Sequence, residues 1–352
     1  MRHLWGNDAN FLKNIYIFCF FLQKRFTSYQ SDDIIKVHKN AFVAYATERK
    51  VMKIGVSSYS FSKHLAATKC GYEQICNIAK EMGFEGIEFV GLVNEKWGIT
   101  GDPIEIAKSI RAHCEKIGLE IIAYTVGANF LKPNPEEQVA ELKRCVDICE
   151  ALGAKVMRHD VASNPQEFRP IPHYNYRTAI AEIAPYIREV AEYAESKGIK
   201  TCSENHGFFF QSPERVEELI LTVGSKNYGW LCDMGNFLCA DADPVHAVAI
   251  AAPYTFHVHA KDFVFKSGKE IKPAGGWITT NGGNYIRGTV IGHGYVPVVN
   301  CITALKKAGY DGYVSVEFEG MEENLPALEQ GLDSLQKARK VRKKRKLLLG
   351  LA

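Results

Sequence analysis

The sequence predicts an α/β protein whose one large domain is a (β/α)8 TIM barrel. Three observations favour this fold. Helical segments that end at a glycine are followed at once by strand-like runs, this junction recurs five times, and eight strand-like runs lie between residues 54 and 320. Helices and strands that alternate in this way are typical of parallel α/β folds, and eight such units over about 290 residues match the size of a barrel.

The five helix–strand junctions share a glycine at the point where the helix ends. Glycine is favoured there because the chain often turns through a left-handed conformation that costs other residues more. The glycines are Gly83, Gly118, Gly153, Gly198 and Gly309.

The strand-like runs are short, and helical segments separate them. The predicted strands are 54–60, 86–91, 120–126, 155–160, 200–206, 229–235, 255–262 and 313–320. Helices are predicted between them, for example over 103–118 and 296–309, and a last one over 324–344. The alternative fold is a doubly wound open sheet, which normally has a glycine-rich phosphate turn after its first strand. This chain has SSYSFSKH there, so we favour the barrel.

Charge divides the chain into three regions, which we take as an N-terminal extension (1–51), the barrel (52–336) and a basic C-terminal tail (337–352). The net charge of +3 is the balance of +4 in residues 1–51, +8 in the run KARKVRKKRK and −9 in the barrel region. Nucleic-acid binding depends on Lys and Arg against phosphates, so the acidic barrel predicts a protein that does not bind nucleic acid.

The N-terminal extension contains the apolar run IYIFCFFL at 15–22. A membrane span needs about 20 apolar residues, so we expect no stable membrane insertion. No small-residue cleavage site follows the run, and we expect a poorly structured extension, with a targeting or membrane role as the alternative. The ten cysteines include no C-x-x-C pair. We interpret them as reduced thiols of a cytoplasmic protein.

Four consecutive predicted strands carry a strong metal-ligand type towards their carboxyl ends. These residues are Glu204, Asp233, His259 and Glu317. The carboxyl ends of the strands form the active-site face of a barrel, and carboxylates buried there are costly unless they are paired or bind a metal. An ion pair would explain one of them, but four in adjacent strands favour one shared ion. Three carboxylates and an imidazole suit Mn²⁺ or Mg²⁺, with Zn²⁺, Co²⁺ or Fe²⁺ also open.

Five segments resemble the xylose-isomerase-like barrel superfamily, and the resemblance covers about 52–336. They are SENHG (203–207), CDMGN (232–236), HVHAKD (257–262), GTVIGHG (288–294) and GYVSVEFEG (312–320). The superfamily includes ketose 3-epimerases, hydroxypyruvate isomerase, inosose and dehydroshikimate dehydratases, and AP endonucleases. The resemblance implies that the metal ligands are Glu204, Asp233, His259 and Glu317. It also implies that Glu204 and Glu317 are the catalytic acid/base pair.

Further residues match substrate-binding places of the superfamily. We expect His206, Arg287, His159 and Lys261 to contact substrate. Arg158 has the opposite strand parity to His159, so only one of the two readily points inward. Lys261 has Asp262 as an alternative partner. We expect His257 to be packed or to lie behind the ligands, and Glu319 to lie at the rim.

The stretch 264–292 is long for a barrel loop and contains several glycines. Long loops without secondary structure are often functional lids, so we expect a lid over the metal in which Trp277 or Tyr285 covers a sugar face. A surface insertion without function is the alternative.

These features predict a metal-dependent isomerase or epimerase that acts on a small carbohydrate through an enediolate. A dehydratase or lyase of a keto-cyclitol or keto-sugar is the alternative, and a barrel that binds sugars without catalysis is another. An AP-endonuclease-like phosphodiesterase is less favoured, because the resemblance makes its three-zinc site incomplete. The Asp-Arg-His segment of those enzymes corresponds here to Ile286, Arg287 and Gly288, and the histidine of their Asp-x-x-His segment to Asn236. The sequence leaves a homo-oligomer open.

Overall fold

Eight parallel strands close into a barrel in the computed structural model, which describes residues 52–163, 165–168 and 174–341. The strand order is β1-β11-β7-β6-β5-β4-β3-β2, so β1 pairs with both β2 and β11. This closure confirms the (β/α)8 barrel and excludes the open sheet. The barrel strands are β1 (Lys53–Ser57), β2 (Gly86–Val90), β3 (Glu120–Val126), β4 (Val156–His159), β5 (Lys200–Glu204), β6 (Tyr228–Asp233), β7 (Thr255–Ala260) and β11 (Tyr313–Val316).

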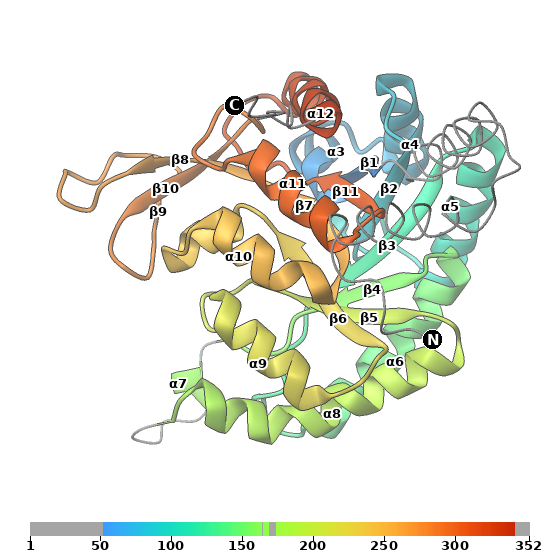
Figure 1. Cartoon of the computed structure of the whole chain (residues 1–352). Coiled ribbons are helices and arrows are strands. Elements are labelled where there is room, and N and C mark those ends of the chain that lie inside the picture. Colours follow the sequence, from blue (N-terminus) through green and yellow to red (C-terminus); the bar gives the residue numbers. More distant parts are fainter. Residues whose placement is uncertain (1–51, 164, 169–173, 342–352) are drawn as a thin grey trace, which may run out of the picture. The chain divides into compact units, whose positions relative to one another are not determined.

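Helices surround the barrel and connect its strands (Figure 1). The α-helices are α3 (Ser62–Thr68), α4 (Gly71–Met82), α5 (Pro103–Ile117), α6 (Pro135–Leu152), α7 (Pro165–Phe168), α8 (Tyr176–Ser196), α9 (Pro213–Val223), α10 (Pro244–Ala251), α11 (Val298–Ala308) and α12 (Asn324–Lys340). Short 3₁₀ turns are η1 (Ser58–Phe61), η2 (Glu95–Trp97), η3 (Asn236–Ala240) and η4 (Ala252–Tyr254).

Local sequence explains where the helices start and stop. At α5, Asp102 Oδ1 accepts hydrogen bonds from the N–H groups of Ile104 and Glu105, and Pro103 occupies the first turn. The helix ends at Gly118, whose φ of 66° is left-handed. All five junction glycines predicted from the sequence have positive φ.

Residues 262–289 form a small antiparallel sheet and not the loop that the sequence predicted. Its strands are β8 (Asp262–Lys266), β9 (Ile278–Thr279) and β10 (Tyr285–Thr289), in the order β8-β10-β9. The sheet projects from the barrel in Figure 1. Aromatic and β-branched residues in FVF and YIRGT favour extended pairing, which explains why this segment has structure.

The hydrophobic core lies between the strands and the helices, whereas the barrel interior is largely polar towards its carboxyl end. Outward-facing Val56 and Ile87 are fully buried against the helices. On the inner side, Gly55 and Gly86 leave the space that Ile122 fills, since a Cβ on either glycine would stand within 2.7 Å of the Ile122 side chain. Buried Ser57, Glu88, Thr125, Arg158, Glu204, Asp233, His257, His259 and Ser315 make up much of the polar interior.

None of the helices in the described part of the chain is long and apolar enough to cross a bilayer. The apolar run 15–22 lies outside the described residues, and so does most of the basic tail. α12 continues to Lys340. Nine cysteines fall within the described ranges and all of them are free thiols.

Candidate metal centre

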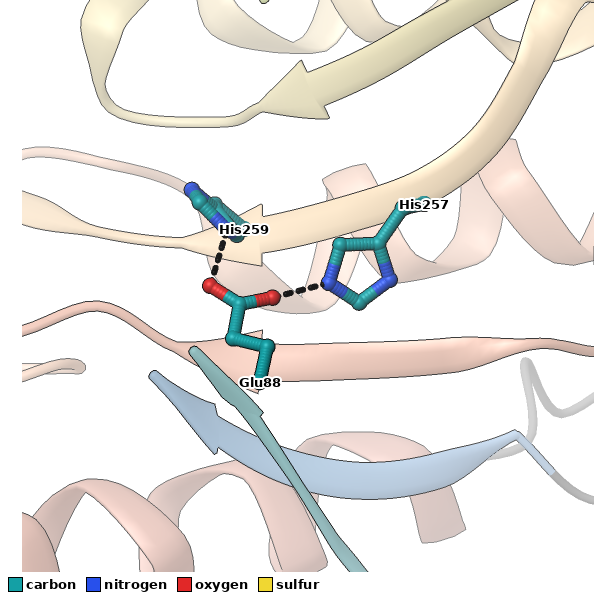
Figure 2. A group of neighbouring side chains, drawn as sticks. All are labelled: Glu88, His257 and His259. Atoms are coloured by element: carbon teal, nitrogen blue, oxygen red, sulfur yellow. Dashed lines mark hydrogen bonds and ion pairs between the residues drawn. The ribbon is translucent and has the colours of Figure 1, made fainter. Parts of the chain in front are cut away.

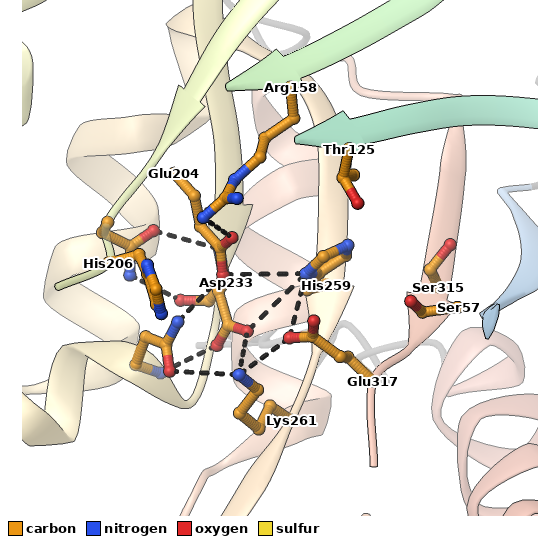
Figure 3. Close-up of polar contacts among 12 residues, drawn as sticks. Ser57, Thr125, Arg158, Glu204, His206, Asp233, His259, Lys261, Ser315 and Glu317 are labelled. Carbon is orange, nitrogen blue, oxygen red and sulfur yellow. Dashed lines mark hydrogen bonds and ion pairs between the residues drawn. The ribbon is translucent and has the colours of Figure 1, made fainter. Parts of the chain in front are cut away.

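Four side chains converge where strands β5, β6, β7 and β11 end (Figure 3). Glu204 is the last residue of β5, and Asp233 is the last of β6 and pairs in register with His259 of β7. Glu317 directly follows β11, and its N–H donates to the Ala260 carbonyl at 3.0 Å. We call Glu204, Asp233, His259 and Glu317 the mouth cluster. One ligand atom from each lies within 4.8 Å of the others, as the strand-end positions predict.

The mouth cluster presents atoms that lack hydrogen-bond partners. His259 Nδ1 lies 3.1 Å from Glu317 Oε2, 3.7 Å from Glu204 Oε1 and 3.9 Å from Asp233 Oδ2. His259 Nδ1, Asp233 Oδ2 and Glu317 Oε2 are buried and make no hydrogen bond within the described residues. Two ligands of one octahedral ion at 2.0–2.1 Å stand about 3 Å apart, so spacings of this size fit a shared divalent cation. The residues present therefore fit a metal.

Lys261 lies inside the acidic side of the mouth cluster. Its buried Nζ is 2.7 Å from Glu317 Oε2, 3.5 Å from Asp233 Oδ2 and 3.1 Å from Glu319 Oε2. Burial raises the pKa of Asp233 to about 7, against the opposing effect of the ammonium. Burial would also raise the pKa of Glu317, but Lys261 and His259 outweigh it and lower that pKa. Lys261 thus neutralises part of the negative charge.

Asp262 does not pair with Lys261. Its carboxylate accepts backbone N–H groups of the following loop, from Gly292 and Gly294 at 2.9 Å and from Val296 at 3.0 Å. The sequence left two partners open for Lys261, and the structure selects the mouth cluster. Asp262 instead holds the loop that leads to α11.

Glu204 is held by a second set of polar contacts. Arg158 Nη2 lies 2.8 Å from Glu204 Oε2 and 2.6 Å from Asp160 Oδ1, and Asn236 Nδ2 donates to Glu204 Oε1 at 2.9 Å. Burial would raise the pKa of Glu204, but Arg158 and His259 outweigh it and lower that pKa. The half-exposed His206 reaches Asp160 Oδ1 through Nδ1 at 3.1 Å, so it lies beside Arg158 at the mouth. The hydrogen bond to Asp160 raises the pKa of His206.

His159 lies on the opposite face of β4 from Arg158. Its ring is fully buried, 6.2 Å from the Phe130 ring and 6.0 Å from the Tyr228 ring. Its Nδ1 donates to the Asp160 carbonyl at 2.8 Å, and burial lowers the pKa of His159 to about 4. Of the two neighbours, Arg158 is the one that faces Glu204, and His159 packs away from the mouth cluster.

Arg287 lies in β10 of the small sheet. Its guanidinium stands 5.4 Å from the centre of the Trp277 ring. Among the described residues no hydrogen bond or ion pair joins Arg287 to the mouth cluster, whereas Lys261 pairs with Glu317 and His206 lies beside Arg158. The expected contact of Arg287 with substrate stays a prediction.

Glu88 is the main site residue that the sequence analysis missed. It is fully buried in β2, and Oε1 accepts a hydrogen bond from His259 Nε2 at 2.6 Å while Oε2 accepts one from His257 Nε2 (Figure 2). We call Glu88, His257 and His259 the Glu88 cluster. An acidic residue inside the predicted strand 86–91 was the signal that could have found it, because strands are depleted in acids.

A family model described as xylose isomerase-like TIM barrel matches residues 76–338. Among curated proteins, the inosose dehydratase of Geobacillus thermodenitrificans is 25% identical over 258 residues, which cover 70% of this chain and 82% of that protein. An uncharacterised protein of Methanocaldococcus jannaschii is 28% identical over 149 residues, which cover 41% of this chain and only 45% of its own length.

Solved structures show the same fold at low identity. The probable 3-DHS dehydratase AsbF of Bacillus anthracis has a TM-score of 0.63 at 18% identity, over 81% of this chain and 99% of its own. The 3-keto-D-glucoside 4-epimerase YcjR of E. coli has a TM-score of 0.58 at 17% identity, over 82% and 100%. A structure of the IOLI protein with a bound zinc atom has a TM-score of 0.63 at 17% identity, over 82% and 98%.

Proposed function

The chain belongs to the xylose isomerase-like TIM barrel family, and from this premise we propose that it is a metal-dependent isomerase or epimerase of a sugar or keto-sugar. The observation that carries the proposal is the mouth cluster. Glu204 and Glu317 come from β5 and from the end of β11, which β6 and β7 separate, and both face the point that Asp233 and His259 also face. Two carboxylates that approach one substrate from different strands provide an acid and a base.

We propose Mn²⁺ or Mg²⁺ as the cation, with Zn²⁺, Co²⁺ and Fe²⁺ as alternatives, because three of the four donors are carboxylates. A cation bound there supplies the charge that acidifies the C–H bond beside the substrate carbonyl and stabilises the enediolate. Asp233 Oδ1 accepts hydrogen bonds from the N–H groups of Gly235 and Asn236 at 2.7 Å. These bonds fix the carboxylate, so that Oδ2 would face the cation.

The two glutamates would move the proton. Since contacts with Arg158 and Lys261 lower the pKa values of Glu204 and Glu317, both carboxylates are ionised and able to accept a proton at neutral pH. One removes the proton from the carbon next to the carbonyl, and the C–H electron pair becomes the enediolate double bond. Return of that proton by the same glutamate to the neighbouring carbon, while the hydroxyl proton passes to the former carbonyl oxygen, gives the isomer. The epimer needs a proton on the opposite face, which the other glutamate would give after taking one from solvent.

Three cationic or polar groups beside the glutamates would bind substrate oxygens. Lys261 and Arg158 donate hydrogen bonds from the interior, and the half-exposed His206 donates from the rim. We assign to Arg158 the part that the sequence analysis gave to His159, because Arg158 is the residue that contacts Glu204.

A dehydratase is the second candidate, because the chain is 25% identical to an inosose dehydratase over most of that enzyme. The same carboxylate would remove the proton beside the carbonyl, and a hydroxyl on the next carbon would leave as water. Lys261, which lies 2.7 Å from Glu317, is placed to give the leaving hydroxyl its proton. The product would be an α,β-unsaturated ketone.

A phosphodiesterase has less support. The resemblance places a histidine of the AP endonucleases at the position of Asn236. Here the Asn236 amide donates to Glu204, and its oxygen faces Lys261 Nζ at 3.3 Å. A cationic ammonium at this point does not favour a further metal ion.

The test is solvent exchange with metal-loaded protein in D₂O. Keto-sugars, ketoses and keto-cyclitols are incubated with the Mn²⁺ and Mg²⁺ forms and followed by NMR and ultraviolet absorbance. We expect deuterium beside the carbonyl together with a changed configuration, whereas an ultraviolet-absorbing enone would select the dehydratase. Glu317→Gln should abolish exchange, and Glu323→Gln, a change at an exposed residue before α12, should retain it. Failure of every substrate class to exchange or dehydrate would contradict both candidates.

A further inference from the structure

We propose that Glu88 is a positioning residue that orients His259 so that Nδ1 faces the cation of the mouth cluster. This inference rests on the proposed function, because it takes the mouth cluster to be a metal site. Glu88 contacts neither that point nor the substrate-binding groups. It would act only through the imidazole of His259.

The geometry of His259 supports this role. An imidazole carries its two nitrogens on different edges, and Glu88 Oε1 takes the Nε2 edge through a 2.6 Å hydrogen bond. The Nδ1 edge is then directed at Glu204, Asp233 and Glu317, where it lacks a hydrogen-bond partner within the described residues. A carboxylate that receives the N–H of a metal-binding histidine selects its tautomer and increases the basicity of the other nitrogen.

Glu88 is itself held in place from a second side. Its Oε2 accepts a hydrogen bond from His257 Nε2, and the same nitrogen lies 3.2 Å from Ser315 Oγ. Glu88 is fully buried, so water does not replace a lost partner. An ionised carboxylate has only acceptor sites and can receive both imidazole N–H groups, whereas an amide offers one acceptor and one donor group.

The alternative occupant of the Glu88 cluster is a second cation. The 2.6 Å separation of Glu88 Oε1 and His259 Nε2 is that of a charge-assisted hydrogen bond. Two atoms bound to one small ion at 2.0–2.1 Å would stand about 3 Å apart. The proton therefore lies between these atoms, and the Glu88 cluster differs in this respect from the mouth cluster.

The first test measures metal affinity and needs no substrate. Mn²⁺ titration calorimetry compares the wild type with Glu88→Gln, and circular dichroism and thermal unfolding check the fold of both. We expect Glu88→Gln to weaken Mn²⁺ binding by about 10–100-fold, as other lost partners of metal-binding histidines do. Glu85→Gln is the matched control: this glutamate precedes the same strand and contacts Ile54 N–H and Arg339, away from the mouth cluster. Its affinity should equal that of the wild type.

A second test does not need Glu88→Gln, so it remains decisive if that variant does not fold. Long-range ¹H–¹⁵N spectra of the Zn²⁺-loaded protein report the state of each histidine nitrogen, and His257→Gln assigns the signals of the pair. We expect His259 to carry its proton on Nε2 and to bind zinc through Nδ1. Zinc on Nε2, a stoichiometry of two ions per chain, or unchanged affinity in Glu88→Gln would overturn the inference. A wild type that binds no divalent ion would instead refute the proposed function.

Discussion

The mouth cluster and the Glu88 cluster share His259, and both are built from carboxylates and imidazoles. They differ in whether their buried polar atoms have hydrogen-bond partners. In the Glu88 cluster one carboxylate accepts hydrogen bonds from two imidazoles, so each of its oxygens has a donor. In the mouth cluster three carboxylates face one imidazole nitrogen at 3.1–3.9 Å, and three buried atoms make no hydrogen bond within the described ranges.

The difference shows that the ratio of acids to proton donors decides what a buried cluster does. A cluster in which every carboxylate oxygen has a donor needs no further partner and is rigid, as expected for fully hydrogen-bonded polar networks. A set with excess carboxylates remains costly until it gains a cation. In the described chain Lys261 supplies part of that charge, and the remaining atoms define where an ion fits.

The largest expected effect comes from changing the mouth cluster itself. Asp233→Asn keeps the oxygen that accepts from Gly235 and Asn236 but removes the charge facing the cation. Metal affinity should fall by more than about 100-fold, which is the largest loss expected when a residue that only hydrogen-bonds to a ligand, such as Glu88, is changed. Equilibrium dialysis with metal analysis measures this. Asp262→Asn changes a buried acid that lies next to Lys261 in sequence but outside the mouth cluster, and it is the control. Equal losses in both variants would show that the loss of affinity is not specific to the mouth cluster.

The next effect concerns the stability of the metal-free protein. Lys261→Met leaves Glu317 and Asp233 without the cation that lies 2.7 Å and 3.5 Å away. Removing one partner of a buried ion pair costs about 3–5 kcal/mol, so the chelator-treated variant should unfold at lower urea, and Mn²⁺ should restore part of the loss.

Lys266→Met provides the matched control for that experiment. Lys266 pairs with Glu270 on the surface, with side chains 34% and 58% exposed, and such pairs contribute about 1 kcal/mol or less. If Lys261→Met is no less stable than Lys266→Met, the ammonium does not compensate the mouth cluster.

The smallest effect on activity is expected at His159, which follows Arg158 in sequence but is packed on the outer face of β4. His159→Phe should leave kcat/KM within about threefold of the wild type, because the side chain does not reach substrate groups. Loss of its hydrogen bond to the Asp160 carbonyl should cost about 1 kcal/mol at neutral pH.

The same variant has a distinct pH signature. Burial lowers the pKa of His159 from 6.5 to about 4, so between these values the unfolded chain binds more protons than the folded one. His159 therefore makes stability fall as the pH drops through this window, and His159→Phe should lose less stability over it. Urea unfolding midpoints at pH 7 and at about pH 4 measure the difference, and parallel changes in wild type and variant would show that His159 is not held neutral.

Much of the site could be predicted because position along a strand is readable from sequence. Glu204, Asp233, His259 and Glu317 were found as polar residues at the ends of predicted strands, where a parallel barrel brings them together. Glu88 carried the same signal but lies in the middle of its strand and not at the carboxyl end, where the other four were sought. Its partners His257 and His259 come from β7, which local sequence does not place opposite β2.

Other choices depended on contacts between distant segments. Arg158 and His159 are neighbours with opposite parity, and barrel closure decided that Arg158 faces Glu204. Lys261 is followed in sequence by Asp262, but the Asp262 carboxylate accepts hydrogen bonds from N–H groups of the loop 292–296. The Lys261 ammonium therefore pairs with Glu317. The stretch predicted as a loop contains a sheet because β8 and β10 pair with each other, and a pairing between two strands does not follow from local periodicity.

The sequence by itself determined the alternation of helix, glycine and strand, and with it the barrel and the four residues at its carboxyl end, because these features follow from local periodicity and spacing. Only the tertiary structure decided which atoms of those residues have hydrogen-bond partners. Glu88 of β2 accepts hydrogen bonds across the barrel from His257 and His259 of β7, and Lys261 forms an ion pair with Glu317 after β11. These contacts join strands far apart in the chain, and the distances that distinguish a shared proton from a bound cation exist only once the barrel has closed.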